Sequence, residues 1–277
     1  MPEILQYSFF QNALLSSILV GVLGGFIGTY IVTRRLVFIA GGLAHASLGG
    51  VGICVLLGIS PLAGAAGFTL LSALGMDKLR RRLSVREDAA VAMLWAFGMS
   101  LGVMCVFLSP SFLPDLPNYI FGNILLSTSE DLIFLTVVTA LTVLFFFRFM
   151  RYITAIAFDS DFARSQHLPV DRIEMALTIL MALSVVAILR TMGIVLAISL
   201  LSLPQITACV FVRKFNHIVV GAMLFTVIDC LVGLVVSYFI NVPSGASIVF
   251  SSVVVYVICK AIKESCMRYK KIQVSGR

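Results

Sequence analysis

The sequence predicts an all-α membrane protein, a polytopic bundle with eight or nine helical spans in a single domain over residues 1–277. Hydrophobic residues make up 60% of the chain and charged residues 12%, roughly half the charged fraction of a soluble domain. The mean hydropathy is +1.07. Apolar runs of about 20 residues, enough to cross a bilayer as a helix, recur along the chain. Barrel strands would instead be short alternating segments.

The expected spans follow from these apolar runs. The third is short, and Arg190 lies between the sixth and seventh, so eight spans is the alternative to nine. The segments are 9–32, 36–58, 61–76, 89–108, 130–149, 173–189, 193–212, 218–240 and 245–262.

Charge orients these spans. If they alternate, 19 of the 20 lysines and arginines fall on one side, and only Arg190 falls on the other. An excess of basic residues marks the cytoplasmic face. We therefore expect the N-terminus outside and the basic tail, residues 263–277, inside, with the proline-rich loop 109–118 outside. The net charge of +7 then reflects loops beside an anionic leaflet, and it requires no nucleic-acid partner.

Residues 34–53, RRLVFIAGGLAHASLGGVGI, place His45 in the middle of an apolar run. An ionisable side chain there is costly in hydrocarbon and usually faces a protein interior or a water-filled path. Neutral imidazole is a good ligand for transition metals. His45 is therefore a candidate metal ligand, and a packing histidine is the alternative. The small residues of the run suit close helix packing: Gly41, Gly42, Gly49 and Gly50.

Three further features carry candidate residues. Asp229, within the eighth span, could bind metal or make a structural hydrogen bond. Pro204 removes a helical hydrogen bond in the seventh span, which suits either a kink beside a translocation path or helix packing. The segment 158–169 has the pattern of a short amphipathic cytoplasmic helix, with an ordinary solvated loop as the alternative. Its acidic residues precede its apolar ones: Asp159, Asp161, Phe162, Ala163 and Leu168.

Five segments together resemble a known family, the membrane permease of zinc-, manganese- and iron-type ATP-binding-cassette (ABC) importers. They occur in the family's order and spacing and extend over nearly the whole chain. The segments are RRLVFIAGGLAHAS, SVREDAAVAMLW, FDSDFARSQHLPV, GIVLAISLLSLPQITA and NVPSGASIV.

The resemblance implies an ABC importer permease of the cobalamin/metal-chelate structural type in the cytoplasmic (inner) membrane. Two permease copies would form a path for divalent metal ions and move them by alternating access. Segment 158–169 would be the coupling helix that docks on a cytoplasmic ABC ATPase, and an extracytoplasmic solute-binding protein would deliver the ion. ATP would bind to the partner, since the chain has no GxxxxGK[ST] motif. We therefore expect a transport subunit that is not an enzyme and holds no permanent cofactor.

Two positions depart from the family pattern. An aspartate normally lies four residues before the histidine, on the same helix face, and this chain has Gly41 there. His45 would then act as a weak or transient ligand, or together with its copy in the second subunit, unless Asp229 supplies the acid. The family commonly has glycine where this chain has His167. Zinc, manganese and ferrous iron all accept these ligand types, so the residues do not choose the metal.

Other functions fit less well. Siderophore and cobalamin permeases are usually longer, with more spans, and lack a histidine in this small-residue helix. A secondary transporter would normally carry more intramembrane ionisable residues. A membrane-embedded enzyme would need a catalytic constellation, whereas His167 and His217 are expected at the cytoplasmic edge and no HExxH motif occurs.

The charge count makes a topology prediction. A reporter fused after Arg277 should read cytoplasmic, and one inserted near Pro114 should read external, because basic loops remain inside. Reporter activity on intact cells measures both. The opposite pattern would contradict the span assignment.

Overall fold

A computed structural model gives the fold over residues 8–83, 86–109, 124 and 127–275. Apart from one 3₁₀ residue, the regular structure in these ranges is α-helical. The helices are α1 (Ser8–Thr33), α2 (Val37–Leu56), α3 (Pro61–Leu83), α4 (Glu87–Leu108), α6 (Ser129–Phe158), α7 (Ser160–Ser165), α8 (Val170–Met192), α9 (Ile194–Leu200), α10 (Leu203–Phe211), α11 (Phe215–Ile240) and α12 (Ser244–Ser275).

The expected number of spans is confirmed. Eight segments of the described residues are long and apolar enough to cross a membrane, and a shorter apolar helix over Pro61–Met76 coincides with the third expected segment. The segment expected at 193–212 is present, but it consists of two short helices, α9 and α10. Most of the loop expected at 109–118 lies outside the described residues.

Three helices end in the same tight turn, in which the residue after the C-cap adopts a left-handed conformation. These residues are Arg35 after α1, Gly58 after α2 and His167 after α7, with φ angles of 60°, 69° and 59°. The next residue donates its N–H back to the helix; for example, Leu36 donates to the carbonyl of Ile31 at 2.8 Å. This hydrogen-bonded turn satisfies carbonyls that a helix end would otherwise leave free.

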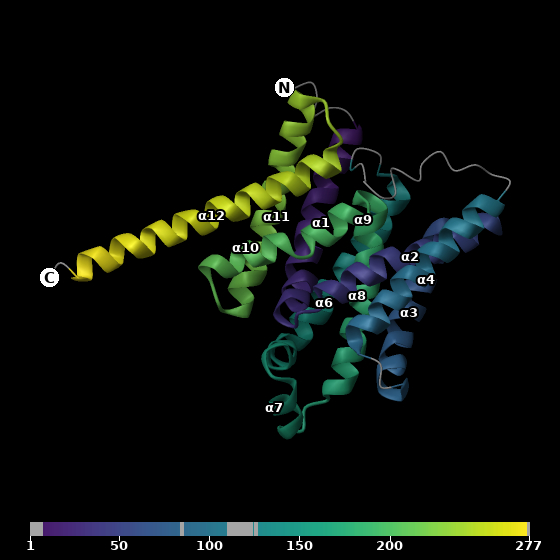
Figure 1. Cartoon of the computed structure of the whole chain (residues 1–277), viewed down its shortest axis with the longest axis horizontal. Helices are drawn as coiled ribbons and strands as arrows, with labels where there is room; N and C mark the ends of the chain where they lie inside the picture. Colours follow the sequence, from purple (N-terminus) through teal and green to yellow (C-terminus); the bar gives the residue numbers. More distant parts are fainter. Residues whose placement is uncertain (1–7, 84–85, 110–123, 125–126, 276–277) are drawn as a thin grey trace.

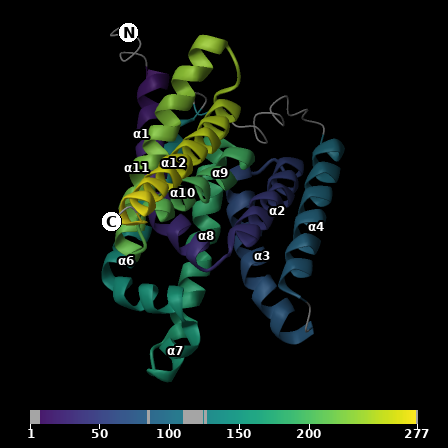
Figure 2. The same cartoon turned by 60° about the vertical axis from the view of Figure 1, so that its left-hand side comes forward.

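The helices form two groups on either side of α8 (Figures 1 and 2). In one group α2 packs against α3 and α4, and in the other α11 packs against α1, α10 and α12. Helix α8 contacts α1, α2, α3 and α6, which places it at the centre. The end of the bundle that carries α7 also carries the end of α3 and the start of α4 (Figure 2); we call it the α7 end.

Glycines allow the backbone of α2 to approach its neighbours closely. A Cβ atom at Gly50 would lie 2.0 Å from the Gly64 carbonyl oxygen of α3. A Cβ atom at Gly49 would lie 3.0 Å from the Gly98 carbonyl oxygen of α4, and one at Gly42 would lie 2.3 Å from a Val91 methyl carbon. At Gly50 the obstacle is a backbone atom, so a side chain there would require the helices to separate, and the three contacts fit the packing role expected for these glycines.

The packing predicts a difference between two glycines. Gly50→Ala should lower stability by about 1–3 kcal/mol, because the added methyl group forces α2 away from α3. Gly67→Ala is the matched control on α3, where a Cβ atom meets nothing within 4 Å. Thermal unfolding of the purified protein in detergent compares them. Equal melting temperatures would contradict the close-packing account.

Candidate functional site

Helix α2 holds His45 against the chain's single tryptophan. The imidazole of His45 stacks on the indole of Trp95 from α4, with ring centroids 4.2 Å apart and planes inclined by 8°. The indole N–H of Trp95 donates to the Met99 sulfur at 3.0 Å, which fixes the indole in turn. The Nδ1 atom of His45 is buried and has no hydrogen-bond partner among the described residues. A buried polar atom without a partner is costly, so a ligand at this nitrogen would relieve the cost.

Gly41 lies one helical turn before His45 and faces α9. Among the described residues, a Cβ atom at Gly41 would contact only Ile198, at 3.7 Å, which is ordinary van der Waals distance. This glycine therefore differs from Gly42, Gly49 and Gly50, where backbone or side-chain atoms crowd the position. A side chain could begin at residue 41 without displacing a helix, so the absence of an acid there reflects the sequence and not a lack of space.

Asp229 does not join His45. Its side chain is 1% exposed in α11, and its Oδ1 atom has no hydrogen-bond partner in the described part of the chain. Its neighbour across the helix interface is Ser252 of α12. Because α2 and α11 belong to different helix groups (Figure 1), the structure keeps these two candidate ligands apart. Among the described residues no group of three or more histidine, cysteine, aspartate or glutamate side chains could hold a metal ion.

Pro204 starts a helix and does not kink one. It lies in the first turn of α10, and the chain has already left α9 at Leu200. The Leu200 carbonyl would have accepted a bond from residue 204, which has no N–H. The side chain of Gln205 replaces that bond, since its Nε2 donates to Leu200 at 3.0 Å and to Gly24 of α1 at 2.9 Å. No local sequence pattern identifies Gln205 for this role, because its second partner, Gly24, lies 181 residues away.

Arg190 forms an ion pair within the bundle. A long basic side chain near a helix end can extend to the membrane boundary. Instead its Nε and Nη2 atoms both lie 2.9 Å from Oδ1 of Asp131, a side chain that is 5% exposed. Thr128 caps α6 and donates to the other Asp131 oxygen at 2.7 Å. The pair joins α6 to α8 at the end opposite α7. Local sequence patterns do not reveal this pair, because 59 residues separate the two side chains.

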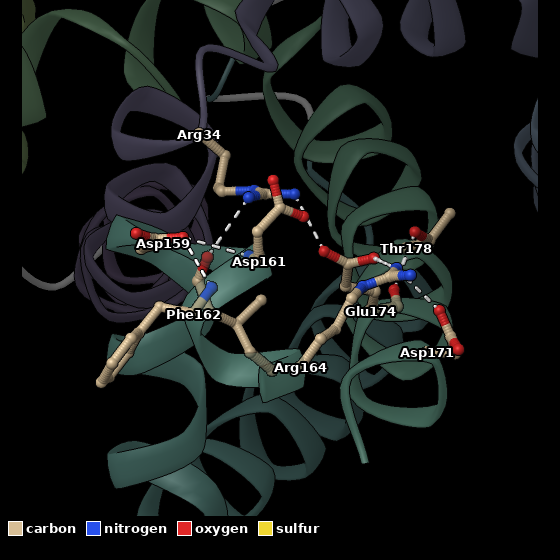
Figure 3. A network of polar contacts seen from close by, with 9 residues as sticks. Arg34, Asp159, Asp161, Phe162, Arg164, Asp171, Glu174 and Thr178 are labelled. Carbon is tan, nitrogen blue, oxygen red and sulfur yellow. Dashed lines mark hydrogen bonds and ion pairs between the residues drawn. The ribbon is translucent and has the colours of Figure 1, made fainter. Parts of the chain in front are cut away.

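The polar segment 158–169 forms the helix expected from its sequence (Figure 3). Asp159 is its N-cap, and the carboxylate accepts from the backbone N–H of Asp161 at 3.1 Å and of Phe162 at 2.9 Å. Phe162 points outward and is 60% exposed, and Asp161 is exposed beside it. Ala163, in contrast, is completely buried and Leu168 is half-buried, so both anchor α7 to the protein.

The turn after α7 explains a departure noted in the sequence. His167 has a φ angle of 59°, in the left-handed region that favours glycine. Its N–H donates to Arg164 and that of Leu168 donates to Ala163, at 3.0 and 3.2 Å. The glycine common in the resembling family suits this turn, whereas the histidine adopts it at a cost of roughly 1 kcal/mol.

Comparisons with known proteins agree with this architecture. A model of the ABC 3 transport family matches residues 6–263. The manganese transport system membrane protein MntC of Listeria monocytogenes is 29% identical, over 99% of this chain and 98% of that protein.

Solved structures are similar in fold. A chain of PsaBC from Streptococcus pneumoniae, determined in complex with a Fab, has a TM-score of 0.82 and 27% identity, covering 92% of this chain and 91% of that one. A protein assigned to the metal-chelate type of ABC transporter, solved in an inward-facing conformation, has a TM-score of 0.67 at 15% identity over 90% of this chain and 84% of that one, and it shares the fold. The predicted fold class is confirmed, and the chain belongs to the ABC 3 transport family as a permease of the metal-importing type.

Proposed function

We propose that this permease moves a divalent transition metal ion across the cytoplasmic membrane, driven by ATP hydrolysis on a separate ABC ATPase subunit. Manganese is the metal named for the Listeria relative, and zinc and ferrous iron suit the same ligand chemistry. A second permease copy completes the path, and a solute-binding protein delivers the ion from outside. The α7 end is cytoplasmic, in keeping with the positive charge of its loops.

The observation that carries this proposal is the unpartnered Nδ1 of His45. A neutral imidazole held by ring stacking can accept an ion at Nδ1, and among the described residues no hydrogen bond competes for that nitrogen. Without a carboxylate at residue 41, ligation is weak, and weak ligation suits an ion that must leave again. Asp229, on the other helix group, is assigned a structural role with Ser252.

Coupling to the ATPase is assigned to α7. Asp159 fixes the start of the helix, while Asp161 and Phe162 face outward as the contact surface. Ala163 and Leu168 hold the helix to the protein, so a push on Phe162 is transmitted inward. Alternating access then follows from ATP-dependent closure of two ATPases, each pressing on one copy of α7.

Metal ligation predicts the effect of substitutions at His45. His45→Gln keeps a hydrogen-bonding side chain but binds metal poorly, so uptake of radiolabelled manganese or zinc should fall by at least about tenfold. His217→Gln, an exposed position on α11, is the control and should transport normally.

A second substitution at the same site tests the missing acid. Gly41→Asp should tighten metal binding and slow release, because carboxylate and imidazole would share one helix face. Uptake at the wild-type rate in His45→Gln, with unchanged metal affinity in Gly41→Asp, would place the path elsewhere.

The coupling role predicts a separate phenotype. Phe162→Ala should weaken co-purification of the ATPase by about tenfold or more, as expected when a large exposed anchor is removed. The matched control is Phe147→Ala, because Phe147 is 86% exposed in the middle of α6, away from α7. Full ATPase binding and uptake in the Phe162 variant would reject α7 as the docking element.

A further inference from the structure

A chain of ionic contacts connects α7 to the turn between α1 and α2 (Figure 3). Glu174, in the second turn of α8, accepts from Nη2 of Arg34 at 2.9 Å through its Oε1 atom. Its other oxygen, Oε2, lies 3.8 Å from Nη2 of Arg164, the penultimate residue of α7. Glu174 is therefore shared between an arginine of α7 and an arginine at the α1–α2 turn.

The two ends of this chain of contacts differ in burial. The side chains of Arg34 and Glu174 are 27% and 22% exposed, whereas Arg164 and its second partner, Asp171, are 49% and 69% exposed. Exposed ion pairs contribute little because water and salt screen them. A partly buried pair is screened less, so the Arg34–Glu174 contact is the firmer link.

Arg34 is well placed to pass on a displacement. It follows the last residue of α1 directly and lies three residues before Val37, the first residue of α2. Arg35, between Arg34 and α2, is held in the left-handed turn, so the link between α1 and α2 is short and fixed by hydrogen bonds. The Nη1 atom of Arg34 also donates to the Ile156 carbonyl at 3.2 Å, in the last turn of α6. Arg34 thus touches both helices that flank α7.

We propose that Glu174 is a positioning residue that transmits movement of α7 to Arg34 and so to α2, the helix that carries His45. The inference rests on the proposed function, since it requires α7 to be pressed by an ATPase. It assigns a role to the ion pairs beneath the coupling helix: they make α2 and α7 move together.

The test is the ratio of metal transported to ATP hydrolysed in proteoliposomes containing the complete transporter. Glu174→Gln keeps the size of the side chain and removes its charge. It should bind the ATPase normally and hydrolyse ATP, yet transport at least about fivefold less metal per ATP, the lower end of typical coupling between sites. Asp171→Asn is the matched control, because it removes the exposed partner of the same Arg164, and its ratio should stay within about twofold of wild type.

A second variant tests the same contact with the charge retained. If Glu174→Gln fails to accumulate, Glu174→Asp, which keeps the charge but shortens the reach to Arg34, should show the lowered ratio.

A Glu174 variant that transports as much metal per ATP as the wild type would overturn the inference. So would an Asp171→Asn variant whose ratio falls as far as that of the Glu174 variant. A loss of ATPase binding that parallels the loss of transport would also overturn it, because it would indicate a merely structural role. Failure of the wild-type complex to transport metal on ATP would instead contradict the proposed function itself.

Discussion

Backbone contact between α2 and its neighbours is the constraint on which the rest of the structure depends. Gly50 meets Gly64 of α3, and Gly49 meets Gly98 of α4, at distances that leave no room for a methyl group. Helix α2 therefore cannot rotate or slide without separating from α3 and α4. Separation would lose many van der Waals contacts at once. The direction of His45, and its stacking on Trp95, follow from this fixed position.

A helix held so closely moves as a body with its neighbours. Its beginning lies beside Arg34, which reaches Glu174 on α8 and the end of α6, so the α7 end has a mechanical connection to α2. At the opposite end the Asp131–Arg190 pair joins α6 to α8. The central helix is thus fastened by charge near both ends, while the apolar contacts between these ends permit small shifts of one helix group against the other.

Much of this could be predicted from the sequence, and the rest could not for identifiable reasons. Hydropathy predicts the spans, because it is a property of local segments. The break between α9 and α10 depends on Gln205, whose side chain replaces the bond that Pro204 cannot make. The partners of His45 and Arg190 come from other helices, which no local pattern specifies. Ala163 is an apolar residue of the segment expected to dock on the ATPase, but in α7 its side chain is buried against the protein.

Electron spin-echo spectroscopy of bound Mn²⁺ can detect contact between the ion and His45. The complex of permease and ATPase would be loaded with Mn²⁺ in the absence of the solute-binding protein, so that no other protein supplies the ligands. We expect modulation from one directly coordinated imidazole nitrogen, because the Nδ1 atom is buried and has no hydrogen-bond partner among the described residues. Bound Mn²⁺ with no nitrogen modulation, or with modulation that persists in His45→Gln, would contradict it.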